Sequence, residues 1–486
     1  MNVRHRRTLA LVLLSSAFVS ACGLKPEVKE QLAQNPAVAG GAGAVGLDPI
    51  GAGGVDPVTG DPLVPGSDPG ALDGPTDGPA AAGPDAPAAG GTDAPAADAP
   101  AADAPAAGGT DRPAAGPAPA ESGTTTGIDA GRKTVKITLH GPLTGAGVPQ
   151  ESFRSGTPKY WNGRKLKNGY TVIAEAVDDK YNAPDALRAC NAAARDSFLI
   201  VGGAGTDQIQ ACAQSQVLRR GNVPYLSSGV TESGLGKLPN YFATSLTYKQ
   251  QGALIPQFAR DNKFLDGSWA VVITEGPNFA DARESVVSAL QKAGVNGKSG
   301  KFTSGNDVYL TAKTGTNCST LAGQLRNTYT RIYFLGQPSY FISCVTSIGY
   351  TPTYQPVYVG VGPSFGIQSV GRLACTNTAN QYKGFFLHPS PGLDTAAQRA
   401  PGVSFQDDIE YGIYGAMQQL EQAFNQVPGQ LTREKFIATL RQGGVKGGIL
   451  SPAIYRGQVF GGTAAFGLQS NCNDQGRTKT LKTYAK

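Results

Sequence analysis

Histidine and metal-binding cysteine patterns are scarce in this chain of 486 residues. The sequence has three histidines, of which only His140 and His388 lie beyond the first 22 residues, and no CxxC pair. Structural zinc sites are built from cysteines and histidines clustered at short spacings. The sequence therefore argues against structural zinc, and we expect neither a bound metal nor a cofactor.

Complete catalytic motifs are missing as well. Asn296-Gly-Lys-Ser299 lacks the earlier glycine of a phosphate-binding loop, and Gly203–Gln208 lacks the third glycine of a dinucleotide-binding fingerprint. Gly362-Pro-Ser-Phe-Gly366 matches the nucleophile-elbow pattern, but no acid lies between Ser364 and His388, the nearest downstream histidine. We therefore expect no enzyme. Esterase chemistry at Ser364 is the alternative, and it would have to disappear in Ser364→Ala.

Aromatic residues are absent from residues 26–130, which consist mostly of Gly, Ala, Pro and Asp. Such a segment cannot bury enough apolar surface to offset the loss of chain entropy on folding. Its prolines favour extended geometry and its acids repel one another. We expect a disordered, acidic Pro/Ala/Gly-rich tether over residues 22–130.

The N-terminus has the features of an export signal. Arg4, Arg6 and Arg7 precede the apolar run Leu9–Phe18, which is too short to span a bilayer comfortably. Val19-Ser-Ala-Cys22 then follows the pattern of a bacterial lipobox. We expect a signal peptide over residues 1–21 and lipidation of Cys22, which would anchor the chain on the outer face of the cytoplasmic membrane. An ordinary signal peptide with an incidental cysteine is the alternative.

Six cysteines remain beyond Cys22, and an even number in an exported chain favours disulfides. Six cysteines allow 15 different connectivities, which the sequence alone does not distinguish. Sequence proximity favours pairing between neighbours, which gives Cys190–Cys212, Cys318–Cys344 and Cys375–Cys472.

The region after the tether is basic. Residues 131–486 hold 36 Lys and Arg against 21 Asp and Glu, whereas residues 23–130 hold three against 15. The basic residues are scattered, without the long runs or interleaved aromatics of a nucleic-acid-binding surface. We therefore expect no nucleic-acid partner. Contact with anionic wall or membrane polymers is one interpretation, and a solvated surface without a specific partner is the other.

Short apolar runs alternate with helical patterns from residue 131 onward, which indicates βαβ units and parallel sheets. The expected strands are Thr134–His140, Thr171–Asp178, Phe198–Gly202, Val223–Ser227, Trp269–Thr274, Arg331–Gly336 and Val357–Gly360. The expected helices are Asp185–Arg195, Asp207–Arg220, Ala280–Ala293, Ser319–Asn327, Asp407–Phe424 and Thr432–Arg441.

Two stretches resemble the start of the type I periplasmic binding proteins that bind branched-chain amino acids. Lys136–Gly145 is a strand that ends in Gly-Pro-Leu-Thr-Gly, and Val172–Leu187 is a strand that ends in Asp-Asp before a helix opening at Asn182-Ala-Pro. Tyr241–Gly252 resembles the first crossing between the lobes of that family, and Gly384–Pro389 resembles the return.

The resemblance implies an α/β fold of two doubly wound, Rossmann-like lobes joined by three crossover strands and preceded by the tether. Lobe 1 would comprise residues 131–247 and 388–455, and lobe 2 residues 248–387 and 456–486. The third crossing would lie within residues 447–465. The resemblance places Asp178 and Asp179 at a strand-to-helix junction. Adjacent strand residues face opposite ways, so the two carboxylates are not expected to form an acid/base dyad.

The resemblance also implies a ligand site in the loops that follow the strands, because ligands bind beyond the carboxyl ends of open parallel sheets. The loops Gly203–Asp207 and Ser227–Thr231 resemble the family loops that hold the ligand carboxylate. Phe279 takes the place of an aromatic residue that lies over the ligand in the family. Helix capping and core packing are the alternative roles for the same residues. Carried over by position, the ligand-binding residues are Thr144, Gly145, Gln150, Gly205, Thr206, Ser228, Gly229, Thr231, Phe279 and Gln337.

One departure from the family concerns the ligand amino group. Amino-acid-binding members have an acid after the strand before the second crossover, and Val359–Pro363 contains none. Asp207 or Glu275 would have to substitute, or the ligand would be a carboxylate, an amide or an aromatic acid without an amino group.

We therefore expect an extracytoplasmic lipoprotein that captures a small polar organic solute and delivers it to the permease and ATPase subunits of an ABC importer. The alternative is a ligand-sensing lipoprotein of the same fold that acts on a membrane signalling partner.

Overall fold

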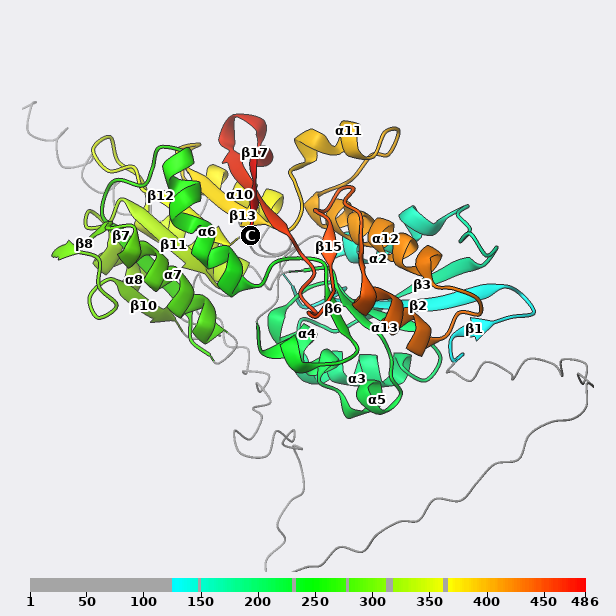
Figure 1. The fold of residues 1–486 in the computed structure, drawn as a ribbon. Helices are drawn as coiled ribbons and strands as arrows, with labels where there is room; N and C mark the ends of the chain where they lie inside the picture. Colours follow the sequence, from blue (N-terminus) through cyan, green and yellow to red (C-terminus); the bar gives the residue numbers. More distant parts are fainter. Residues whose placement is uncertain (1–124, 147–149, 230–232, 277–278, 312–317, 362–365) are drawn as a thin grey trace, which may run out of the picture. The chain divides into compact units, whose positions relative to one another are not determined.

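The computed structural model describes residues 125–146, 150–229, 233–276, 279–311, 318–361 and 366–486. The signal peptide, Cys22, most of the tether, Thr231 and Ser364 lie outside the described residues. Within them, two β-sheets carry helices on their faces (Figure 1). No helix in these ranges combines the length and apolar character that crossing a bilayer requires.

The first sheet has six strands and is parallel apart from β1. In the strand Thr134–Gly141, every second residue from Val135 to Leu139 points into the same apolar core. Val135, Ile137 and Leu139 are completely buried there. The strands are β1 (Ile128–Asp129), β2 (Thr134–Gly141), β3 (Thr171–Asp178), β4 (Leu199–Gly202), β5 (Tyr225–Ser227) and β6 (Tyr241–Ala243).

The second sheet has seven strands, of which the first five across the sheet are parallel and the last two form an antiparallel hairpin at one edge. In order across the sheet they are β10 (Val308–Thr311), β7 (Trp269–Thr274), β11 (Arg331–Leu335), β12 (Val357–Val361), β13 (Gly384–His388), β16 (Ala464–Asn471) and β17 (Arg477–Ala485).

Helices contribute to two apolar cores on each sheet, as expected for doubly wound units. The first sheet packs with α2 (Glu151–Trp161), α12 (Asp408–Gln426) and α13 (Arg433–Gln442) in one core, and with α3 (Ala183–Ala193), α4 (Thr206–Ala213) and α5 (Gln216–Arg220) in the other. The second sheet packs with α6 (Tyr248–Asp261) and α7 (Ala280–Lys292), and with α8 (Ser319–Leu325), α9 (Pro338–Ile348) and α10 (Ile367–Asn377). The remaining short elements are α11 (Ala396–Arg399), β8 (Asn296–Gly297), β9 (Gly300–Lys301), β14 (Gly444–Val445) and β15 (Ala453–Ile454).

The chain passes between the sheets three times. It leaves the first sheet between β6 and α6, returns after β13 to form α12 and α13, and crosses again between β15 and β16. This arrangement confirms the predicted α/β fold with two doubly wound parallel sheets.

Three disulfides join the cysteine pairs that sequence proximity favoured. Cys190–Cys212 links α3 to α4, Cys318–Cys344 links the start of α8 to α9, and Cys375–Cys472 links α10 to the end of β16. Each bond therefore ties neighbouring elements that already pack together.

Two predictions about local structure are wrong. Residues 207–220 form two helices instead of one, because the Ser215 side chain accepts the N–H groups of Val217 and Leu218 and so begins α5. The folded region also begins before residue 131, since β1 pairs with Thr134 and Val135 of β2. The expected end of the tether at residue 130 is therefore several residues too late.

Candidate functional site

The carboxyl ends of the parallel strands place several polar loops at one edge of each sheet. In the first sheet these loops follow β2, β4 and β5, and in the second they follow β7, β11 and β12. Such edges are where open α/β sheets bind ligands.

The loop after β2 is anchored to the end of β3. The Asp178 carboxylate accepts the Thr144 N–H at 3.0 Å and the Thr144 hydroxyl at 2.5 Å. Burial opposes ionisation of Asp178, but these bonds and two further N–H donors outweigh it and lower the pKa of the carboxyl. Gly145 has a φ of +79°, and a Cβ there would lie 2.3 Å from the Lys180 carbonyl oxygen. Gln150 closes the loop by donating its Nε2–H to Ala146 O at 2.8 Å.

The loops after β4 and β5 are linked by short polar contacts. Gly205 begins α4 with a φ of +81°, and the Ser228 hydroxyl donates to the Gly202 carbonyl at 2.8 Å. The Gly229 carbonyl accepts the Ser245 hydroxyl at 2.7 Å. These contacts hold the two loops next to each other at the edge of the first sheet.

Tyr248, the first residue of α6, joins loops of both sheets. Its hydroxyl lies 3.1 Å from Thr206 Oγ1, and its ring centre lies 5.9 Å from that of Phe279. Tyr248 also contributes, after burial, to the raised pKa values of Tyr181 and Tyr333. The predicted residues Thr206 and Phe279 therefore meet through an aromatic side chain that the sequence analysis treated only as part of a crossover.

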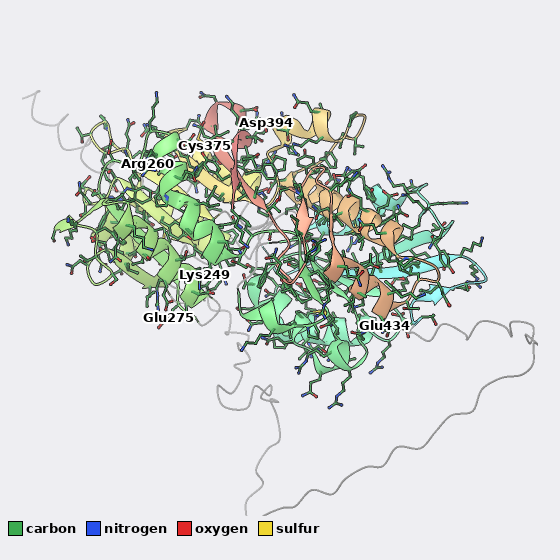
Figure 2. The ribbon with its side chains drawn as sticks, in the orientation of Figure 1. Lys249, Arg260, Glu275, Cys375, Asp394 and Glu434 are labelled. Atoms are coloured by element: carbon green, nitrogen blue, oxygen red, sulfur yellow. A yellow bond between two sulfur atoms is a disulfide. The ribbon has the colours of Figure 1, made fainter. Side chains whose placement is uncertain are left out.

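Gln337 and Glu275 lie at other strand ends of the second sheet. Gln337 precedes α9 and makes no side-chain capping bond, so its amide remains a candidate ligand contact. Glu275 follows β7 and is exposed (Figure 2).

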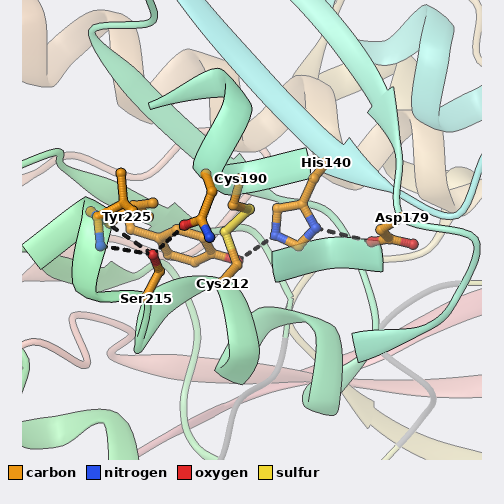
Figure 3. Close-up of a disulfide and its surroundings, with 9 residues drawn as sticks. His140, Asp179, Cys190, Cys212, Ser215 and Tyr225 are labelled. Atoms are coloured by element: carbon orange, nitrogen blue, oxygen red, sulfur yellow. Dashed lines mark hydrogen bonds and ion pairs between the residues drawn. A yellow bond between two sulfur atoms is a disulfide. The ribbon is translucent and has the colours of Figure 1, made fainter. Parts of the chain in front are cut away.

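A buried hydrogen-bonded chain lies beneath the loops of the first sheet (Figure 3). His140 Nδ1 lies 2.9 Å from Asp179 Oδ2, and its Nε2 lies 2.6 Å from the Tyr225 hydroxyl. With the carboxylate as acceptor, Nδ1 carries the ring proton and Tyr225 donates to Nε2. All three side chains are fully buried. This hydrogen-bonded network therefore links the carboxyl ends of β2 and β3 to the start of β5, and its buried side chains offer no group to a solute.

The same region contains a set of metal-ligand types. His140, Cys190 and Cys212 place one ligand atom each within 4.8 Å of one another. The two sulfur atoms are joined in a disulfide, and both ring nitrogens of His140 are hydrogen-bonded. Metal binding requires thiolates, so this disulfide form does not present a metal site.

The carboxylate of Asp408 lies at the N-terminus of α10, a helix that packs with the second sheet. The residue itself lies on α12, and its carboxylate accepts the N–H groups of Ile367 at 2.9 Å and Gln368 at 3.1 Å. Burial raises the pKa of Asp408 above its ordinary value, while these backbone bonds oppose the shift. An acid thus does reach the region after β12, but it comes from a segment far along the chain and is already paired with α10.

A small cavity lies between the loops after β4 and β5, the segment that follows β13, and α12. Its volume is about 10 Å³, which is enough for a single water molecule. A larger hollow of about 560 Å³ lies between α6 and α7 and not at the strand ends. The small cavity is lined by Gly203, Ser228, His388, Pro389, Ser390, Asp408, Ile409, Gly412, Ile413 and Leu450.

The sequence pointed to these loops but not to several residues of other elements that lie against them. Ser228 and the Gly203 loop line the cavity, and Thr206 and Phe279 meet at Tyr248. Thr144, Gly145 and Gln150 shape a neighbouring loop. The residues missed are Tyr248, His388, Ser390 and Asp408; the scarcity of histidine was the one signal that could have drawn attention to His388.

Comparison with known proteins agrees with this geometry. A family model described as periplasmic binding protein matches residues 134–466. Among curated proteins, the sequence has no significant match.

Several solved structures share the fold. A fatty acid ABC transporter substrate-binding protein from Thermomonospora curvata superposes with a TM-score of 0.60 at 16% identity, over 74% of this chain and 94% of that chain. A solute-binding protein of an ABC transporter from R. palustris, in complex with 4-hydroxybenzoate, gives 0.58 at 14% identity over 73% and 97%. A branched-chain amino acid transporter substrate-binding protein from Streptococcus pneumoniae, in complex with isoleucine, gives 0.56 at 13% identity over 73% and 99%.

Proposed function

Because the chain belongs to the periplasmic binding protein family, we propose that it is an extracytoplasmic lipoprotein that captures a small polar organic solute for an ABC importer. The observation that carries the proposal is the meeting of loops from both sheets at the carboxyl ends of their strands. Thr206 of the first sheet reaches Tyr248 of α6 at 3.1 Å. A site made from two sheets can bind by closing around its ligand.

Closure is the mechanism that this site supports. The Thr206–Tyr248 bond and the bonds from Asp408 to α10 join segments of the two sheets. The cavity between the loops accommodates one water molecule but no organic solute. A solute would therefore enter when these contacts separate, and it would favour closure by contacting both sheets at once.

The chemistry of the loops favours a solute with a carboxylate, carbonyl or amide oxygen. Gly205 and Thr206 form the N-terminus of α4, where backbone N–H groups suit an anion. Ser228 is hydrogen-bonded to Gly202 in the preceding loop. The relatives described above are named for fatty acids or hold 4-hydroxybenzoate or isoleucine, and all of these compounds carry a carboxylate. The ring-rich surroundings of Tyr248 and Phe279 suit an apolar or aromatic body on the same molecule.

Thr144, Gly145, Gln150, Gly229, Thr231 and Gln337 remain proposed contacts of the solute. Lipidation of Cys22 and a tether that holds the domain away from the membrane complete the proposal, and they rest on the sequence of residues 1–130. A sensing role would use the same fold and the same closure, so the partner decides between the two. The solved relatives are named as ABC-transporter proteins, which favours import.

A thermal-shift screen of the full-length chain, made in an oxidising compartment, tests the proposal. The probes would be 4-hydroxybenzoate, 3,4-dihydroxybenzoate, isoleucine, a medium-chain fatty acid, simple amides and neutral sugars. A probe at about a hundred times its dissociation constant should stabilise the fold by roughly 2.7 kcal/mol. Stabilisation by a carboxylate class, with small-angle scattering that shows compaction, is the expected result. A ligand that stabilises the chain without compacting it would contradict the closure mechanism.

A further inference from the structure

His388 ends the strand that carries the chain back from the second sheet. It is the last residue of β13, next to the carboxyl end of β12, and it is only 2% exposed. This position puts its ring at the edge where the loops of the candidate site gather.

One ring nitrogen of His388 is fully occupied by Ser390. Nδ1 lies 3.2 Å from the Ser390 N–H nitrogen, 3.0 Å from its hydroxyl and 2.9 Å from its carbonyl oxygen. Ser390 is 1% exposed, and its buried N–H needs an acceptor, which among the described residues is Nδ1. Nδ1 can pair with either the N–H or the carbonyl of Ser390, but not with both, and a buried N–H without an acceptor is rarer than a buried carbonyl without a donor. We therefore assign Nδ1 as the acceptor of the N–H, which puts the ring proton of the neutral imidazole on Nε2 and leaves the carbonyl oxygen without this donor.

The other ring nitrogen is buried without a partner. Within the described part of the chain, His388 Nε2 makes no hydrogen bond. Burial lowers the pKa of His388 to about 4, so the ring stays neutral near pH 7. A buried polar atom without a partner is costly in a folded protein and calls for an explanation such as an absent ligand or water.

The cavity beside His388 contains groups from the first sheet. Gly203 and Ser228, which follow β4 and β5, line it together with His388 and Ser390. The Ser228 hydroxyl donates to Gly202 O, so its remaining capacity there is as an acceptor. Asp408 also lines the cavity, but each of its oxygens accepts an N–H of α10. His388 lines the same cavity, and its Nε2 is a ring nitrogen without a hydrogen-bond partner in the described part of the chain.

We propose that His388 Nε2–H donates a hydrogen bond to an oxygen atom of the bound solute, and that this bond selects ligands with a carboxylate or carbonyl oxygen. This inference rests on the proposed binding function and adds a specificity-determining residue to the same site. Because the donor is neutral, it discriminates by hydrogen bonding rather than by charge. Solutes of the same shape that lack the oxygen would leave Nε2–H unpaired on closure.

The binding test compares His388→Phe with His388→Gln in the full-length chain. Both changes remove the bonds to Ser390, but only the glutamine amide can still donate from the position of Nε2. Using 4-hydroxybenzoate and isoleucine as probes in calorimetric titrations, His388→Phe should weaken binding about tenfold to a hundredfold. His388→Gln should recover a substantial part of that loss.

Tyr358→Phe is the matched control. Tyr358 lies on β12, and its hydroxyl is also buried without a partner in the described part of the chain. It does not line the cavity, so its removal should leave the dissociation constant of each probe unchanged.

A spectroscopic measurement keeps the test valid if His388→Phe fails to fold. Beyond the signal region the chain has only His140 and His388, so nitrogen-15 spectra of labelled histidine contain two rings. In the wild type, His388 should carry its proton on Nε2, and that proton should move downfield when a probe binds. A proton on Nδ1, or an Nε2–H that does not respond to a bound probe, would overturn the inference.

The outcomes separate this inference from the proposed function. If no probe stabilises the wild type, binding of this ligand class fails, and the role of His388 fails with it. If a probe binds and His388→Phe binds it equally well, only the role of His388 is refuted. A crystal structure in which one water holds Nε2 both with and without the probe would have the same meaning.

Discussion

Asp407 offers a quantitative test of the packing beside the candidate site. Its carboxylate begins α12 by accepting the Glu410 N–H at 3.0 Å, and it also accepts the Ser152 hydroxyl. The residue is 5% exposed. Burial, reinforced by the neighbouring Asp408 charge, raises the pKa of Asp407 from 3.8 to about 6.

The pKa shift predicts a definite dependence of stability on pH. Between pH 4 and 6 the folded state holds a proton on Asp407 that the unfolded state has released, so the free energy of unfolding falls as pH rises. A shift of about two pKa units corresponds to roughly 3 kcal/mol. The loss should begin near pH 4 and be complete above pH 6.

Asp407→Asn should remove this contribution, because asparagine caps a helix about as well as aspartate and does not titrate. We expect the stability of the variant relative to wild type to rise by roughly 3 kcal/mol between pH 4 and pH 7. Urea unfolding at four pH values measures the difference. Glu284→Gln, at an exposed position on α7, controls for the loss of one acid. A difference between Asp407→Asn and wild type that does not change with pH would refute the reasoning.

Three further predictions concern the supports of the site. Replacing Cys375 and Cys472 by serine should lower the urea-unfolding free energy by about 4.7 kcal/mol, the entropic cost for a loop of this size, whose cysteines lie 97 residues apart; a loss below 1 kcal/mol would contradict this. Asp408→Ala should cost about 2–4 kcal/mol in the same assay, because two N–H groups at the start of α10 lose their acceptor, and unchanged stability would show that water replaces it. Gly145→Ala should lower stability by more than about 1 kcal/mol, since the positive φ and the close carbonyl oxygen exclude a side chain; a neutral outcome by thermal unfolding would show that the loop rearranges.

Two strands were predicted with their full extent. Trp269–Thr274 and Thr171–Asp178 were predicted with the boundaries that the structure has. Both segments are rich in β-branched residues, which favour strands. The split between α4 and α5 was missed because Ser215 resembles an ordinary helix residue until its capping bonds are seen. The hairpin of β16 and β17 was missed because the strand Arg477–Ala485 is largely polar and lies at a sheet edge.

The site was predictable only at the level of loops. Topology places the loops after β4 and β5 at one edge of the sheet, whereas Ser228 and Thr206 within those loops were proposed from the family resemblance. The contact between Asp408 and Ile367, and the position of His388 beside Ser228, join segments that are distant in the chain. No local pattern encodes such pairs, and they emerge only when both sheets are assembled.

The Cys375–Cys472 bond also determines how tension would travel through the molecule. The segment between these cysteines contains β13, α12 and α13, and with it the second and third passages between the sheets. A pull applied to the two ends of the chain would pass from residue 375 directly to residue 472 through sulfur. The helices α12 and α13, which carry Asp407 and support the cavity, lie outside that load path, so a stretched tether would strain the rest of the fold before it reached them.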